Sequence, residues 1–148
     1  KIVITKYNIG INYQELEEEA SKHNVPIFYE NNNETKDRFN KIKFNLNGTI
    51  DKEHSHKNCY HAKYCATVEN GILYKCPIIP AARHFNQYFK QNIKITEADG
   101  INLYKKNSKE NILKYFREPT PFCSYCDVSE RNSPQKWEIS KKDIKEWT

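Results

Sequence analysis

The sequence predicts an α+β fold in which a strand–helix–strand unit precedes a smaller region built from a β-hairpin and helices. Short apolar runs at residues 2–4 and 27–29 flank a polar stretch with helical spacing, which is the usual order of a parallel βαβ unit. A hairpin pattern follows at residues 65–76, and all five cysteines lie beyond residue 58. We therefore expect two domains, residues 1–53 and residues 54–148.

The helix of the first domain is marked at both ends. Asn12 can cap it, and Glu15 is three residues on, where the return partner of a capping box stands. Leu16 and Ala20 then fall on one face at a spacing of four, and Pro26 ends the helix. These features predict a helix between the two apolar runs.

The rest of the first domain carries weaker signals. Residues 30–37 form a polar loop, and residues 39–46 alternate apolar and polar side chains. Asn47-Gly48 is a strong turn signal. We expect a loop, then a strand, then a turn.

The second domain opens with a β-hairpin whose turn is Asn70-Gly71, flanked by β-branched and aromatic residues. Pro77 and Pro80 then lead into a helix with Ala81, Phe85 and Phe89 on one face. This pattern predicts that the hairpin passes directly into a helix.

The remainder of the second domain shows three further elements. A helix capped by Ser108 is expected to bury Ile112, Leu113 and Phe116 before Pro119 and Pro121 stop it. A short strand is expected over 137–139. Ser140 and Asp143 indicate a last helix, with Ile144 and Trp147 as apolar anchors.

The composition narrows the class of protein. The hydrophobic fraction is 37%, with no apolar run near the roughly 18 residues that a membrane span needs. The net charge of +5 comes from lysines spread along the chain, which predicts a solvated surface and argues against nucleic acid as a partner.

The first residues of the chain lack the long apolar region of a secretory signal, so we expect a cytoplasmic protein. The sequence begins at Lys1 and contains no Met, so we expect it to be a piece of a longer protein.

The cysteines form the one organised chemical pattern. Their spacing is C-x5-C-x10-C, a gap of 46 residues, then C-x2-C. A C-x2-C pair can turn two sulfurs toward one metal unit, and a hairpin brings cysteines at its two bases together. Thiolates are preferred by zinc and by iron–sulfur clusters, so the residues predict a tetrathiolate metal site without choosing the metal. The cysteines concerned are Cys59, Cys65, Cys76, Cys123 and Cys126.

The stretch from Cys59 through Cys65 to Gly71 and Cys76-Pro77 resembles the opening of SPASM and twitch domains, the auxiliary-cluster modules that follow the radical S-adenosylmethionine (radical SAM) barrel. Eleven residues separate Cys59 from Gly71, and four separate Gly71 from Cys76. Residues 122–127 and 137–140 resemble the closing segment of that family. The first domain is similar, more weakly, to the last strand–helix–strand steps of the radical SAM partial barrel.

The resemblance implies an auxiliary [4Fe–4S] cluster that serves electron transfer or substrate placement. Five cysteines are enough for one cluster, as in the twitch form, and we expect Cys59, Cys65, Cys76 and one of the final pair, with Cys126 preferred, to bind it. Full ligation by four thiolates favours electron transfer or structure over direct substrate binding.

The chain lacks the C-x3-C-x2-C motif that holds the cluster cleaving S-adenosylmethionine. We therefore expect it to be inactive alone and to work with its own N-terminal radical SAM region. The substrate is open between a peptide, a sugar and a small molecule.

A zinc-binding module without catalytic activity, docking nucleic acid or a protein, is the alternative. His54, His56 and His61 could complete a zinc site, although we expect them to be exposed polar residues. Glu97 and Asp99 could form an acid–base pair, but carboxylates two apart in a loop are expected to be solvated and not catalytic.

Overall fold

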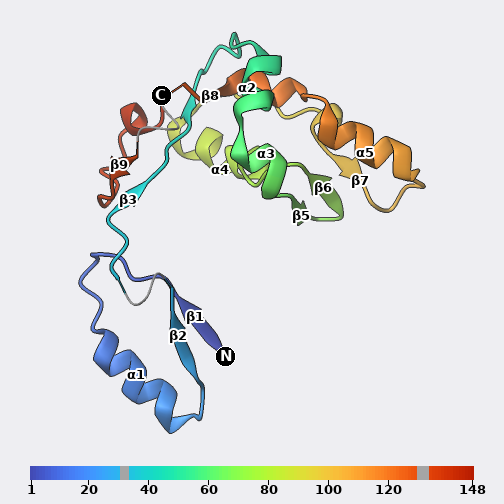
Figure 1. Cartoon of the computed structure of the whole chain (residues 1–148). Helices are drawn as coiled ribbons and strands as arrows, with labels where there is room; N and C mark the ends of the chain where they lie inside the picture. Colours follow the sequence, from blue (N-terminus) through green and yellow to red (C-terminus); the bar gives the residue numbers. More distant parts are fainter. Residues whose placement is uncertain (31–33, 130–133) are drawn as a thin grey trace. The chain divides into compact units, whose positions relative to one another are not determined.

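The computed structural model describes residues 1–30, 34–129 and 134–148, and it mixes helices with small sheets (Figure 1). The predicted α+β class is therefore confirmed. The chain forms two compact units: Lys1–Lys41 with residues 134–141, and residues 42–129 with residues 142–148. The domain boundary predicted after residue 53 falls inside the second unit.

The first unit contains the predicted strand–helix–strand. Strands β1 (Ile2–Ile4) and β2 (Ile27–Tyr29) pair in parallel, and helix α1 (Tyr13–Lys22) connects them. Asn12 caps the helix as predicted, since its side chain accepts a hydrogen bond from the Glu15 amide at 3.3 Å. The βαβ interpretation of this stretch is confirmed.

The single strand predicted over 39–46 is wrong. The structure has two short strands instead, β3 (Arg38–Phe39) and β4 (Lys43–Phe44), which pair with different partners. The chain leaves one unit and enters the other between them, so one continuous ladder is impossible. The partner of β3 is β9 (Gln135–Lys136), two residues earlier than the strand predicted at 137–139.

The hairpin of the second unit is confirmed. Strands β5 (Thr67–Glu69) and β6 (Ile72–Tyr74) pair antiparallel, and β7 (Ile101–Asn102) extends the sheet on the other side of β6. Asn70 and Gly71 have φ of 50° and 75°, the left-handed values of a type I′ turn. This turn closes the hairpin in register and fixes where Cys76 leaves it.

The two predicted helices after the hairpin are also confirmed: α4 (Ile78–Phe89) follows Pro77, and α5 (Lys109–Arg117) is capped by Ser108. Leu113, predicted to be buried, is 41% exposed, because α5 packs through Ile112, Tyr115 and Phe116. The last helix, predicted from Ser140 and Asp143, forms only as the short 3-10 helix η4 (Ile144–Glu146), which Asp143 caps. The helices not anticipated are α2 (Lys52–Asn58), α3 (Tyr60–Tyr64) and the 3-10 helices η2 (Glu97–Asp99) and η3 (Pro121–Tyr125).

The core of the second unit is built around cysteines. One buried cluster joins Cys76 and Cys126 to apolar side chains of α4 and η3, and a second joins Cys59 to Ala62 and Val128. Helix α2 packs on η3, and strand β8 (Cys126–Asp127) pairs with β4. Within the described residues, no helix has the length and apolar character required to cross a bilayer.

Candidate metal centre

Four of the five cysteines are buried in the second unit. The exposed fractions are 8% for Cys59, 6% for Cys76, 9% for Cys123 and 7% for Cys126, whereas Cys65 is only partly buried. All five are free thiols. Burial therefore separates Cys65 from the other four.

Each buried cysteine lies at the end of a secondary-structure element or inside a short turn. Cys59 is the residue between α2 and α3, and Cys76 follows β6 just before α4. Cys123 lies within η3, and Cys126 opens β8 opposite Phe44. The C-x2-C pair thus lies across one 3-10 turn, which brings its two side chains to the same part of the core.

Hydrogen bonds hold these backbone positions together. Ser55, which is 1% exposed, donates its hydroxyl to the Cys126 carbonyl at 2.6 Å and ties α2 to β8. The Cys59 amide donates to the His56 carbonyl at 3.2 Å. The Thr120 hydroxyl lies 3.8 Å from the Cys123 sulfur.

The pKa values of two of these thiols are raised. Burial, with smaller contributions from the neighbouring Cys59 and Cys123, raises the pKa of Cys76 to about 11. Burial raises the pKa of Cys126 as well, and so do Cys76, Cys123 and Cys59. Thiolates this close to one another repel, so they become stable together only when a cation neutralises them.

Cys76 also receives stabilising dipoles. The amide N–H groups of Ile78 and Ile79, in the first turn of α4, hydrogen-bond its sulfur and lower its pKa, opposing the effect of burial. These are the amides that an α-helix leaves without internal partners, at the positive end of its dipole. The start of α4 is therefore suited to a thiolate.

The positions of the four buried cysteines decide whether a single metal ion or a larger metal cluster fits them better. No three His, Cys, Asp or Glu side chains in the described part of the chain are set where they could hold one metal ion. Four thiolates on one zinc stand about 3.8 Å apart, from a Zn–S bond of about 2.3 Å. A four-iron cluster is bulkier and spreads its thiolates further apart. The donor set of four buried thiols fits such a cluster in chemistry and number.

Asp99 is fully buried, so the prediction of a solvated carboxylate is wrong. One carboxylate oxygen accepts from the Thr96 amide and hydroxyl, both at 2.8 Å, and the other accepts from the Phe122 amide at 2.7 Å. Thr96 and Asp99 form a capping box on η2, a pattern of residue types that the sequence contains. This carboxylate fixes the residue that precedes Cys123. Glu97 is exposed, as predicted.

Among the histidines, His54 is exposed as expected, while His56 and His61 are half-buried. Nε2 of His56 is shielded from solvent and has no hydrogen-bond partner among the described residues. Burial lowers the pKa of His56, and the nearby charge of Lys75 lowers it further. His56 lies on α2 one turn before Cys59, so a neutral imidazole with an unused nitrogen lies beside the cysteine region.

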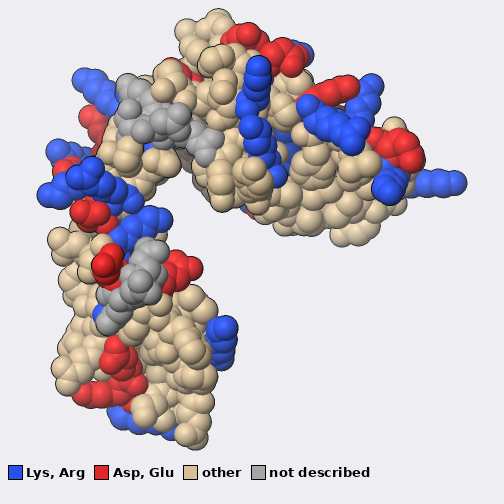
Figure 2. Space-filling model, in the orientation of Figure 1, with Lys and Arg blue, Asp and Glu red and all other residues tan. Residues whose placement is uncertain are grey.

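The surface carries both signs of charge. On the face shown in Figure 2, Lys and Arg side chains are interspersed with Asp and Glu. This mixture fits the solvated surface expected from lysines that are spread along the sequence.

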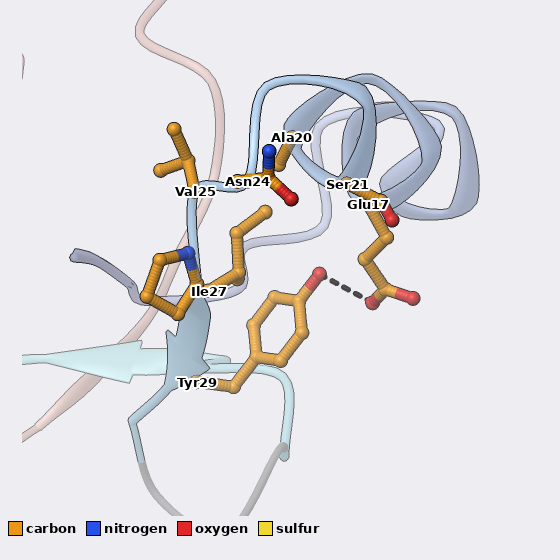
Figure 3. Close-up of a pocket in the computed structure, with 8 residues that line it drawn as sticks. Glu17, Ala20, Ser21, Asn24, Val25, Ile27 and Tyr29 are labelled. Atoms are coloured by element: carbon orange, nitrogen blue, oxygen red, sulfur yellow. Dashed lines mark hydrogen bonds between the residues drawn. The ribbon is translucent and has the colours of Figure 1, made fainter.

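A hollow with a volume of about 660 Å³ lies in the first unit, which contains none of the cysteines (Figure 3). In its lining, the Tyr29 hydroxyl donates to Glu17 at 2.6 Å, and this bond raises the pKa of Tyr29 to about 12. A second groove of about 530 Å³ runs along α4 in the second unit and is almost wholly apolar, with Phe44, Phe85, Phe89 and Trp147 in its lining. The predicted face of Ala81, Phe85 and Phe89 forms one side of it. Neither hollow contains a cysteine.

Comparison of the chain with protein-family models, curated proteins and solved structures finds no match. The chemistry of the buried cysteines is therefore the feature from which a function can be argued.

Proposed function

We propose that Cys59, Cys76, Cys123 and Cys126 bind an auxiliary [4Fe–4S] cluster, and that this chain is the C-terminal part of a radical SAM enzyme. The observation that carries the proposal is the burial of four thiols, all less than a tenth exposed, that come from three separate segments of the chain, with Cys76 and Cys126 each sensing the charge of the other buried thiols.

The proposed ligand set differs from the set expected from the sequence in one member. The resemblance favoured Cys65 and only one of the C-x2-C pair. Burial and the charge effect of Cys123 on Cys126 instead favour both members of the pair, and leave Cys65, partly buried at the end of α3, as a spare thiol. Two residues of the same 3-10 turn would then supply half of the ligands.

The surrounding residues support a charged, water-excluded site. The first amides of α4 favour a thiolate at Cys76, and His56 offers an unused ring nitrogen near Cys59. Hydrogen bonds to sulfur, such as those from the Ile78 and Ile79 amides to Cys76, adjust the reduction potential of a bound cluster, which when present supplies a centre for one-electron transfer. With four thiolates bound, no iron is left open for substrate, so we assign the site to electron transfer or structural support.

The first unit has the order expected for the end of a radical SAM barrel, with β1 and β2 parallel and joined by α1. S-adenosylmethionine and its own cluster would belong to a separate N-terminal region of the same enzyme. The five free thiols fit a reducing compartment such as the cytoplasm. The substrate class stays open between peptide, sugar and small molecule.

Metal analysis of the chain purified without oxygen tests the proposal. We expect about four iron and four sulfide ions per chain, with a broad absorption band near roughly 400 nm. Single Cys→Ser variants at positions 59, 76, 123 and 126 should lose most of the iron. The matched control is Cys65→Ser, which removes the partly buried thiol and should retain the wild-type iron content.

Other outcomes point elsewhere. One zinc per chain and no colour would replace the cluster with a zinc-bound structural module. Loss of iron in the Cys65→Ser variant, with retention in Cys123→Ser, would restore the ligand set expected from the sequence. A colourless chain without metal would overturn the proposal.

A further inference from the structure

Lys75 is an unusual residue in the second unit because it is only 1% exposed. Lysine is almost never fully buried unless its charge is compensated, since removing an ammonium from water is costly. It stands directly before Cys76 in sequence. A buried lysine is therefore bonded directly to a proposed ligand of the cluster.

The lysine is held by neutral groups. Its ammonium donates to the carbonyls of Tyr115, at 2.7 Å, and of Glu118, and it lies 4.6 Å from the centre of the Tyr115 ring. Its amide donates to the Tyr115 hydroxyl at 2.9 Å, which in turn donates to the Asp99 carbonyl at 2.7 Å. These bonds place the ammonium, and none of them brings a full negative charge.

No carboxylate among the described residues lies within ion-pairing distance of this ammonium. Burial lowers the pKa of Lys75, and the groups that oppose this most are Cys123 and Cys76, ahead of Asp99 and Glu118. The sulfurs of Cys123 and Cys76 are thus the groups that would favour this ammonium most when a metal holds them as thiolates.

We propose that the positive charge of the Lys75 ammonium stabilises the reduced form of the cluster and so raises its reduction potential. This inference rests on the proposed function. A [4Fe–4S]²⁺ core on four thiolates carries a charge of about −2, and one electron from a reductant such as dithionite takes it to about −3 with no bond formed or broken. A fixed cation attracts the more negative state more strongly.

Reductive titration of the iron-loaded full chain, followed by electron paramagnetic resonance, tests the role of Lys75. Lys75→Met removes the charge and keeps an unbranched apolar stem. We expect at least a tenfold fall in the equilibrium constant for reduction, which is about 59 mV for one electron. The matched control is Lys63→Met on α3, where the lysine is exposed and the change should be less than twofold.

A second variant protects the test against misfolding. Lys75→Gln also removes the charge but keeps N–H donors for the Tyr115 carbonyl, and it should give the same fall. An unchanged potential in a charge-removing variant with full iron content would overturn the role of Lys75 and leave the cluster assignment intact. A wild-type chain that binds no iron would overturn both.

Discussion

At the scale of single residues, the second unit depends on a small set of buried polar groups. Asp99 accepts three hydrogen bonds, and Lys75 donates two to carbonyls near the end of α5. Each group would be costly to bury without partners. Lys75 is adjacent to Cys76, and the Phe122 amide that Asp99 binds is adjacent to Cys123, so the polar network that stabilises the unit also sets the backbone of two proposed ligands.

Asp99→Asn is expected to lower the free energy of unfolding of the second unit by about 2–3 kcal/mol. The amide has the shape of the carboxylate, but its NH₂ must face either the Phe122 N–H or the Thr96 N–H, and two donors then meet. Urea unfolding followed by Trp147 fluorescence measures the change. Glu97→Gln is the matched control on the same 3-10 helix; it is exposed and should change stability by less than about 0.5 kcal/mol. Equal midpoints for the two variants would show that the Asp99 charge contributes nothing.

At the scale of elements, the β5–β6 hairpin delivers Cys76 to the core and places its sulfur at the first turn of α4. Its type I′ turn needs a left-handed backbone at Gly71, where φ is 75°. A Cβ at this position would lie 2.1 Å from Cε2 of Tyr104. Because Tyr104 is 83% exposed, its ring can rotate away, and the backbone conformation is the larger cost.

Gly71→Ala should therefore destabilise the second unit by about 1–2 kcal/mol. Gly10→Ala serves as control, since Gly10 also has a positive φ, of 71°, would meet no atom within 4 Å of an added Cβ, and belongs to the first unit. Thermal unfolding should show the effect of Gly71→Ala at Trp147 and the effect of Gly10→Ala at Trp137. If the Gly71 variant were as stable as wild type, the turn would not require glycine.

Elements with strong local signals could be predicted from the sequence. The Asn70-Gly71 turn, the Ser108 cap and the flanking apolar runs each act within a few residues, and the corresponding elements form as expected. The strand over 39–46 failed because its pairing partners are distant in sequence and lie in different units. Helices α2 and α3 have short, polar sequences and pack against η3 and Val128, contacts that no local pattern reveals; the Asp51 cap of α2 was the one local signal available.

The candidate site was predicted in part. Cysteine spacing indicated that several thiols meet, but the depth of each depends on tertiary packing, and only the structure separates partly buried Cys65 from the buried four. The burial of Lys75 and Asp99 was not anticipated, since both residue types are normally solvated. For Asp99, the available signal in the sequence was its spacing from Thr96, which is that of a capping box.

At the scale of the whole molecule, the cysteines are confined to one of two compact units. Each unit has one of the chain's two tryptophans: Trp137 packs on Tyr7 in the first, with ring centres 5.4 Å apart, and Trp147 accepts a backbone hydrogen bond from Phe44 in the second. A cluster bound by thiolates contributes free energy to the unit that holds it, because the site does not exist in the unfolded chain. The two units should therefore respond differently to loss of the cluster.

Two single-tryptophan chains allow the unfolding of each unit to be followed by itself: Trp147→Phe keeps Trp137 in the first unit, and Trp137→Phe keeps Trp147 in the second. Removing the cluster, by chelation or by Cys76→Ala, should lower the thermal midpoint reported by Trp147 by about 10 °C or more, because each 1 kcal/mol moves the midpoint of a unit this size by about 4–8 °C. The midpoint reported by Trp137 should stay within about 2 °C, since no cysteine lies in that unit. Equal shifts at both tryptophans would mean that the units unfold as one body, and a shift at neither would mean that the thiols stabilise the fold without metal.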